Sequence, residues 1–210
     1  DDVDNPPFFG DLGLFFNAEE GVSGTGDSLT WTDQKTGLVA SKDASYAVAS
    51  YDSVNKTIDT DRSTNARLVI PSSDGLYPAT GSLYVLANAD SSSTGTIKCF
   101  FSTKGPSGTD DGLYFGLADS GAFLDTTGIQ CGNGGQVNTT TRAANGVAIQ
   151  DQYTIYSARL GVEGGANNDV IVNVESTKVT EVDVASPPLG TSNSANITIG
   201  AITGSGNGIT

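Results

Sequence analysis

Residues 152–200, QYTIYSARLGVEGGANNDVIVNVESTKVTEVDVASPPLGTSNSANITIG, carry the pattern that decides the fold. Apolar side chains alternate with polar ones in three runs and in a short fourth one: Tyr153-Ile155, Val170-Val172-Val174, Val179-Val182-Val184 and Ile197-Ile199. Turn-forming Gly, Asn, Ser and Pro separate the runs, which is typical of antiparallel strands that follow one another. The stretch therefore predicts an all-β chain, folded as a two-sheet antiparallel β-sandwich.

The remainder of the chain continues the same pattern of short apolar runs between turns. No apolar stripe with helical spacing extends over more than one turn, so we expect no helix. The polar, glycine-rich segment 132–146 is expected to be an exposed loop or linker. Further strands are predicted over residues 12–16, 29–32, 68–70, 81–89, 96–103 and 112–117.

The length of 210 residues fits one large sandwich domain. The first eleven residues, DDVDNPPFFGD, contain two prolines and four acidic side chains, and are expected to form an N-terminal arm or a first edge strand. Residues 12–210 are then a single domain. No run approaches the roughly 18–20 apolar residues of a membrane span, so we expect no membrane insertion.

The charge is strongly acidic, with 24 Asp and Glu against 10 Lys and Arg, a formal net charge of -14. This balance argues against nucleic acid as a partner, because its phosphates would be repelled. Two interpretations stay open. Carboxylates gathered in loops could bind calcium, which prefers oxygen ligands, or the acidic surface serves only to keep the protein soluble.

Calcium is the one cofactor that the loops suggest, although Asp and Asn are also common simply as turn formers. None of the loops has the spacing of an EF-hand. Asp27 with Asp33 is one candidate pair. The other candidate ligands are Asp110, Asp111, Asp119, Asp125, Asn168 and Asp169.

The two cysteines, Cys99 and Cys131, are too few for a metal site, and the chain has no histidine to complete one. They are candidates for a disulfide in an extracellular protein. If strands 97–102, 112–118 and 126–131 form a simple meander, however, the outer two lie about 9–10 Å apart. A disulfide requires Cα atoms closer than about 7 Å, so both the bridged and the free state stay open.

The stretch LGLFFNAEEGVSGTGDSLTWTDQKTG (12–37) resembles the opening of concanavalin A-like lectin/glucanase domains of the laminin-G type. The shared features are an apolar strand, an acidic loop and the turn Trp31-Thr-Asp33-Gln34. SLYVLANADSSSTGTIKCFFSTKG (82–105) and GLYFGLADSG (112–121) are similar to central strands of that family, and residues 151–200 resemble its late hairpin and its Ile-x-Ile-Gly strand. The family usually adds one more strand, which here either lies outside this sequence or comes from another chain.

The resemblance implies a two-sheet jelly roll outside the cell, on a cell surface or on a virion, often with calcium at a rim. Its glycan-binding members suggest that aromatic side chains bind sugars. The candidates here are Tyr77, Tyr114 and Tyr156, although strand aromatics are commonly core residues or cross-strand pairs.

We expect no enzymatic activity. Related glucanases carry Glu-x-Asp-x-Glu on one strand, whose alternation places three carboxylates on one face. This chain has Glu181-Val-Asp183-Val-Ala185, in which alanine replaces the third carboxylate. Without histidine, a Ser-His-Asp triad is impossible.

Three Asn-x-Thr triplets permit N-glycosylation, at Asn55, Asn138 and Asn196. Two functions stay open at this point. The first is a non-catalytic, surface-displayed lectin-like module that binds glycans or a cell surface. The alternative is a structural subunit of a virion decoration, fibre or filament, whose sandwich contacts other structural proteins or neighbouring copies of itself.

Overall fold

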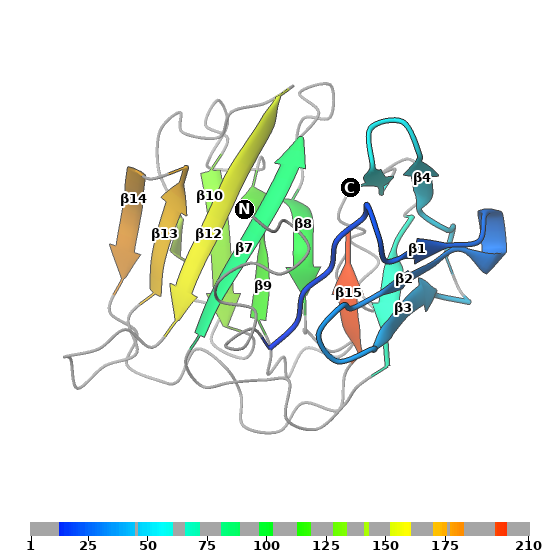
Figure 1. Ribbon diagram of the computed structural model, residues 1–210. Coiled ribbons are helices and arrows are strands. Elements are labelled where there is room, and N and C mark those ends of the chain that lie inside the picture. Colours follow the sequence, from blue (N-terminus) through cyan, green and yellow to red (C-terminus); the bar gives the residue numbers. More distant parts are fainter. Residues whose placement is uncertain are drawn as a thin grey trace. The chain divides into compact units, whose positions relative to one another are not determined.

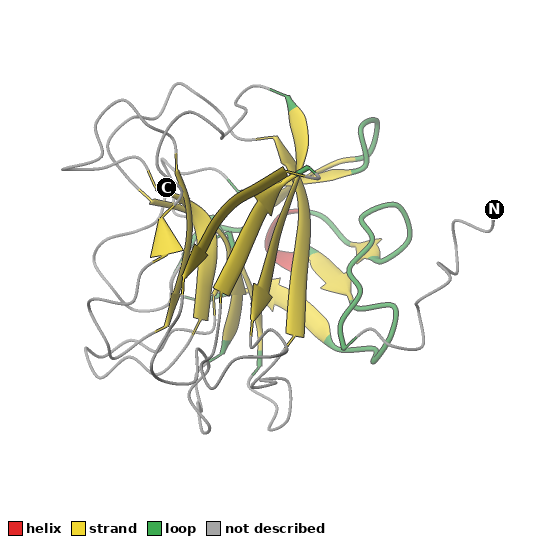
Figure 2. Ribbon diagram, turned by 90° about the vertical axis from the view of Figure 1, so that its left-hand side faces the viewer, coloured by secondary structure: helices red, strands yellow, loops and turns green. Residues whose placement is uncertain are grey.

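The computed structural model contains antiparallel strands and a single short helical turn in the part of the chain that it describes (Figure 2). The described residues are 13–44, 46–60, 66–71, 81–88, 97–102, 113–118, 128–133, 141–142, 152–160, 170–175, 177–182 and 196–200. Over these ranges the fold is all-β, as predicted, and no helix is long and apolar enough to cross a membrane. The chain divides into an N-terminal unit, Asp1–Pro71, and a C-terminal unit, Ser72–Thr210.

The N-terminal unit contains four antiparallel strands in the order β1, β2, β3, β6. Their bounds are Val22–Ser23 (β1), Thr30–Thr32 (β2), Val39–Lys42 (β3) and Leu68–Ile70 (β6). A separate hairpin joins β4 (Ser50–Asp52) to β5 (Thr57–Asp59), and a 3-10 turn, η2, spans Gly26–Ser28. The core of this unit includes the buried side chains of Leu29, Ala40, Leu68 and Ile70.

A buried carboxylate organises the turn between β2 and β3. Asp33 is fully buried and accepts hydrogen bonds from the backbone N–H of Phe15 and from both the N–H and the hydroxyl of Thr36. The Gln34 N–H in turn donates to the Phe15 carbonyl at 2.7 Å. The turn predicted at Trp31-Thr-Asp33-Gln34 is therefore present, and its acidic residue, Asp33, accepts hydrogen bonds from the backbone.

The predicted strand over residues 12–16 is wrong for the residues described. Residues 14–17 have no strand pairing. The Asp33 turn explains this, because it takes up both the N–H and the carbonyl of Phe15, the groups that would otherwise join a ladder. Phe16 instead packs edge-on against Trp31, with ring centroids 5.2 Å apart.

Arg67 is a buried cation in the described part of the N-terminal unit. Its guanidinium lies 3.2 Å from the ring centroid of Tyr46, and its Nε and Nη2 donate to Asp43 Oδ2 at 3.2 and 2.9 Å. An ion pair and a cation–π contact therefore accompany the burial of a charge that would otherwise be costly to desolvate.

The C-terminal unit contains two antiparallel sets of strands (Figure 1). One runs in the order β15, β8, β9, β10, β11, and the other in the order β14, β13, β12, β7. In the first set the bounds are Ile197–Ile199 (β15), Ile97–Ser102 (β8), Leu113–Ala118 (β9), Gly128–Asn133 (β10) and Thr141–Arg142 (β11). In the second they are Thr177–Val182 (β14), Val170–Val174 (β13), Tyr153–Leu160 (β12) and Gly81–Asn88 (β7).

The segment 132–146 differs from its prediction as a continuous loop. Strand β10 continues through Gly132 and Asn133, and Thr141–Arg142 forms the short strand β11, which pairs with β10. Backbone pairing to a neighbouring strand can hold a polar segment that has few apolar side chains of its own.

Aromatic side chains link the two sets of strands within the C-terminal unit. The ring of Phe100 on β8 stacks on Tyr156 of β12 with centroids 5.1 Å apart, and meets Phe115 of β9 edge-on at 5.8 Å. Phe115 and Tyr156 are completely buried. Phe100 lies where the register between β8 and β9 shifts, between Cys99 and Phe101.

Candidate ligand-binding face

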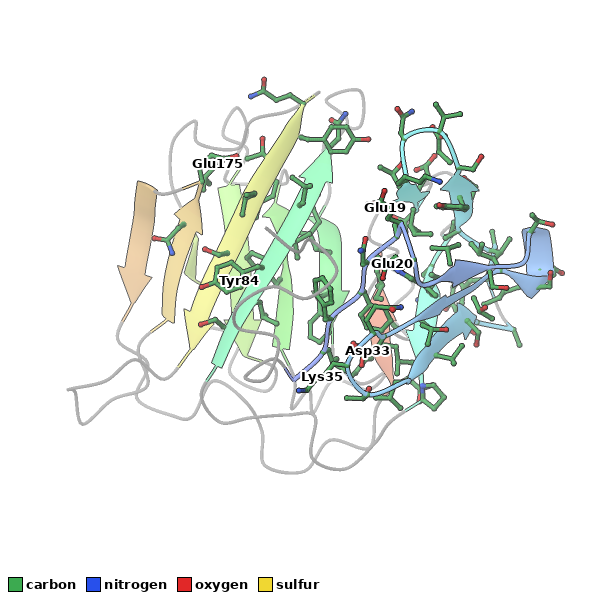
Figure 3. All side chains as sticks on the ribbon, in the orientation of Figure 1. Glu19, Glu20, Asp33, Lys35, Tyr84 and Glu175 are labelled. Carbon is green, nitrogen blue, oxygen red and sulfur yellow. The ribbon has the colours of Figure 1, made fainter. Side chains whose placement is uncertain are left out.

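Strand β7 separates its side chains into two faces. Leu83, Val85 and Ala87 are half-buried, whereas the side chains at even positions, Ser82 to Asn88, are exposed. Tyr84 is labelled on this exposed side in Figure 3. The separation follows from the pleat, which directs successive side chains to opposite faces of a strand.

Strand β12 continues both faces of β7. Thr154, Tyr156 and Ala158 are buried on one face; on the other face Tyr153 and Ile155 are exposed, and Ser157 is buried. The two strands pair in unbroken antiparallel register, which aligns Ile155 with Leu86 and Ser157 with Tyr84. Residues aligned in this way share a face of the sheet.

The exposed side carries four large apolar side chains, which we call the outer face of β7 and β12. Their exposed fractions are 69% for Tyr84, 67% for Leu86, 52% for Tyr153 and 44% for Ile155. Single exposed apolar residues are common on proteins, but a contiguous group of them marks an interaction surface.

Polar groups lie beside this apolar group. Asn173 on β13 pairs in register with Ser157, and its Nδ2 donates to the Ser157 hydroxyl at 3.3 Å. Glu175 continues the pairing past the end of β13: its N–H donates to the Ile155 carbonyl at 2.7 Å, and its Oε1 accepts from the Ile155 N–H at 2.9 Å. Glu175 is exposed and is labelled near the end of β13 in Figure 3.

A tight hairpin holds Glu175 in this position. Val174 pairs with Thr177, so only two residues connect β13 to β14, and Glu175 has a φ of 52°. Two-residue hairpins favour positive φ because the resulting turn matches the twist of the strands. The turn therefore places the carboxylate beside the backbone of β12.

Tyr156 lies on the opposite side of the sheet. Burial raises the pKa of its phenol, and the negative charge of Glu175 adds to that rise, while a hydrogen bond with Thr154 opposes it. The structure thus places this predicted sugar-binding tyrosine in the core, against Phe100.

The other predicted ligand-binding residues are described only in part. Tyr114 lies on β9 in register with Ser102 of β8 and Gly132 of β10. Tyr77 lies outside the described residues, as do all six principal calcium candidates, Asp110, Asp111, Asp119, Asp125, Asn168 and Asp169.

The additional calcium pair is described, and its members have separate partners. Asp27 forms an ion pair with Lys42 at 2.7 Å, whereas Asp33 holds the backbone of the β2–β3 turn. Within the described ranges, no three acidic, cysteine or histidine side chains gather into a group that could hold a metal ion.

The cysteines lie on two strands that flank a third. Strand β9 pairs with both β8 and β10, which forms the predicted meander. Cys99 is aligned with Gly116 of β9, and Cys131 is aligned with Phe115. Strands on either side of a common neighbour lie about 9–10 Å apart, farther than a disulfide spans. The meander on which the geometric objection to a disulfide depends is therefore present in the backbone, and the state of the two thiols stays a prediction.

Two of the three glycosylation candidates are described. Asn55 lies in the exposed turn between β4 and β5, and its Nδ2 donates to Asp52 Oδ2 at 2.6 Å. Asn196 is exposed immediately before β15. Asn138 lies outside the described residues.

Sequence reasoning did not single out the four residues of the outer face. Their strands were predicted, but apolar residues occur on both faces of β7 and β12. The alternation therefore did not indicate which face of each strand is exposed. The adjacent polar positions offered a signal: Ser82 and Asn88 share a face with Tyr84 and Leu86, and polar side chains favour the solvent side.

Comparison with protein-family models found no match to this chain, and a search of curated proteins found no relative. The likeness to lectin/glucanase domains therefore rests on the sequence features given above.

Proposed function

We propose that the chain is a non-catalytic, surface-displayed lectin-like module that binds a glycan or a cell surface through the outer face of β7 and β12. The observation that supports this function is the exposed group of Tyr84, Leu86, Tyr153 and Ile155. A face that presents apolar rings beside hydrogen-bonding groups matches the mixed chemistry of a sugar.

The polar neighbours would supply the hydrogen bonds to a bound sugar. The Glu175 carboxylate accepts hydrogen bonds, and the Asn173 amide both donates and accepts. Sugar hydroxyls take either role. In this proposal, a tyrosine ring packs on the apolar side of a sugar ring, and Asn173 and Glu175 bond to its edge.

We also propose the finer architecture, in which the two sets of strands in the C-terminal unit form a concanavalin A-like jelly roll. The stacking of Phe100 on Tyr156 supports it, because the two rings come from different sets of strands. In that arrangement these rings lie between the layers, and the outer face of β7 and β12 is directed to solvent. The predicted single domain over residues 12–210 stays part of this proposal.

Binding to a broad glycan array, with calcium and again with a chelator, tests the function. We expect glycan binding, and we expect Tyr84→Ala to weaken it roughly tenfold, the loss of about one aromatic contact. Tyr51→Ala, on β4 of the other unit, is the matched control and should leave binding unchanged. A folded protein that binds nothing in either condition would rule the proposal out.

The chelator arm separates two sources of affinity. Binding that disappears with calcium assigns a role to the acidic loops, and binding that persists assigns the affinity to the outer face alone. Loss of binding in Tyr51→Ala equal to that in Tyr84→Ala would instead show that the outer face is not the site.

A structural role, as a subunit of a virion decoration, fibre or filament, is the second candidate. The same exposed apolar side chains favour it, because a protein neighbour could cover them. Solution mass separates the two functions: an obligate assembly would favour the structural subunit. Both candidates place the protein outside the cell or on a virion.

A further inference from the structure

Strand β7 ends its set of strands. Its one partner among the described strands is β12, and no other described strand pairs with the backbone groups of its second edge. Such an edge is a template for another strand, and natural proteins usually protect it with charge, proline or a bulge.

Strand β7 has none of these protections. Its sequence, GSLYVLAN, contains no charged residue and no proline, although the chain as a whole carries a net charge of -14. Its register with β12 is continuous over all eight residues, without a bulge. The edge is therefore long, regular and free of charge repulsion.

The hydrogen bonds of β12 identify which groups of β7 point outward. The N–H and carbonyl of Ile155 both bond to Glu175, on the β13 side. Because successive residues of a strand direct their backbone groups to opposite sides, Tyr156 bonds toward β7, where it is paired with Val85. The backbone N–H and carbonyl of Val85 thus point to β12. The outward backbone groups are those of Ser82, Tyr84, Leu86 and Asn88.

We propose that β7 pairs antiparallel with β7 of a second copy of this chain, around a twofold axis at Val85. This register places Tyr84 opposite Leu86 of the second copy, and Ser82 opposite Asn88. The two most exposed of the four apolar side chains on the outer face thus meet each other, and polar side chains meet polar ones. The pairing is self-complementary, as a twofold interface requires.

Neighbouring registers match less well. An axis at Tyr84 would place Ser82 opposite Leu86, and an axis at Leu86 would place Tyr84 opposite Asn88. Each sets a polar side chain against a large apolar one. Cross-strand pairs of aromatic and aliphatic side chains contribute to sheet stability, so the axis at Val85 is preferred.

The pairing goes beyond glycan binding and does not require it, and it gives the structural alternative one specific contact between neighbouring copies. It uses the backbone edge of β7, whereas a glycan would contact side chains on the outer face. Pairing would join two four-stranded sets and place the apolar groups of two copies side by side. The outer faces of the two copies would then form one continuous surface, twice as wide across the strands.

Sedimentation equilibrium from micromolar to millimolar protein tests the dimer. We expect a reversible dimer for the unmodified chain. The double variant Tyr84→Lys with Leu86→Lys sets like charges directly opposite each other and should weaken dimerisation at least roughly tenfold. Tyr153→Lys with Ile155→Lys is the matched control: it makes similar changes on the same face, but on a strand whose two edges are both paired. Its dimerisation should be unchanged.

A monomer over the whole concentration range would overturn the proposal. Equal loss of dimer in the two double variants would overturn it as well, because it would assign the contact to the face and not to the edge. These outcomes are read without any glycan, so they are independent of the binding experiment.

A cysteine placed on the axis tests the register. Opposed residues in a non-hydrogen-bonded antiparallel pair have Cα atoms about 4.5 Å apart, within the range of a disulfide. In a Cys99→Ser, Cys131→Ser background, Val85→Cys should form a covalent dimer under a mild oxidant, and Leu83→Cys should not. Cross-linking that is equal at the two positions, or absent at both, would overturn the axis at Val85.

Discussion

Two tyrosines on β12 differ in almost every structural respect, although only two residues separate them. Tyr156 is fully buried and stacks on Phe100, whereas Tyr153 is half exposed beside Ile155 on the outer face. The strand places them on opposite sides of one sheet because its side chains alternate. Residue type alone therefore does not say which tyrosine stabilises the fold and which is free to bind a ligand.

The same contrast extends across β7. Its half-buried side chains, Leu83, Val85 and Ala87, share a face with Tyr156, and its exposed ones, Tyr84 and Leu86, share a face with Tyr153. Substitutions on the inner face should therefore change stability, and substitutions on the outer face should change recognition.

The largest difference is expected between Tyr156→Ala and Tyr153→Ala. Removal of the buried ring should lower the free energy of unfolding by about 3–5 kcal/mol, because a large aromatic group is lost and a cavity is left. The exposed ring should change it by at most about 0.5 kcal/mol. Urea denaturation measures both. Equal losses would show that the two faces do not differ as described.

A smaller effect is expected for Ala158→Leu on the inner face. Ala158 is completely buried, so the extra carbons must displace packed neighbours, and we expect a loss of about 1–3 kcal/mol. Thermal unfolding monitored by near-ultraviolet circular dichroism measures this loss. An unchanged midpoint would indicate unoccupied space at this position.

Glu175→Ala tests the polar end of the outer face. It removes the side-chain acceptor of the Ile155 N–H, and we expect a loss of about 1 kcal/mol, the typical net value of one hydrogen bond. Glu175→Gln keeps an acceptor oxygen and should restore most of that stability in urea denaturation. If both variants are equally destabilised, the charge matters and not the hydrogen bond.

The smallest effect near neutral pH, and a distinct one at alkaline pH, is expected for Tyr156→Phe. The pKa of this phenol in the folded state is raised above the unfolded value of about 10, chiefly by burial. The stabilisation from keeping the phenol neutral is complete below the unfolded pKa and is lost as pH rises through the folded pKa. The unmodified protein should therefore lose stability above about pH 10 more steeply than Tyr156→Phe. Parallel curves would contradict the pKa shift.

The sequence predicts the strands of the C-terminal unit well, because long alternating runs such as 81–88 and 153–160 carry a strong signal. It does not predict which face is buried. β12 has apolar side chains at both odd and even positions, so the choice depends on the aromatic rings of β8 and β9, which are distant in sequence.

Two further differences have local causes. The apolar segment around Phe15 was predicted as a strand, but Asp33 takes its backbone groups. Residues 141–142 have no apolar pattern, and they form β11 through pairing with β10. In both cases the partner lies at least ten residues away in the chain, beyond the reach of a periodicity argument.

The Asp33 turn also supplies a natural reporter of how the N-terminal unit opens. The amide protons of Phe15 and Thr36 are held by one carboxylate that is itself buried. Their exchange with deuterium should be slowed by the same protection factor, set by the opening of that unit. The Ile155 amide, which bonds to the exposed Glu175, offers a comparable probe in the C-terminal unit. Exchange at these positions would reveal whether the two units open as one body or in succession.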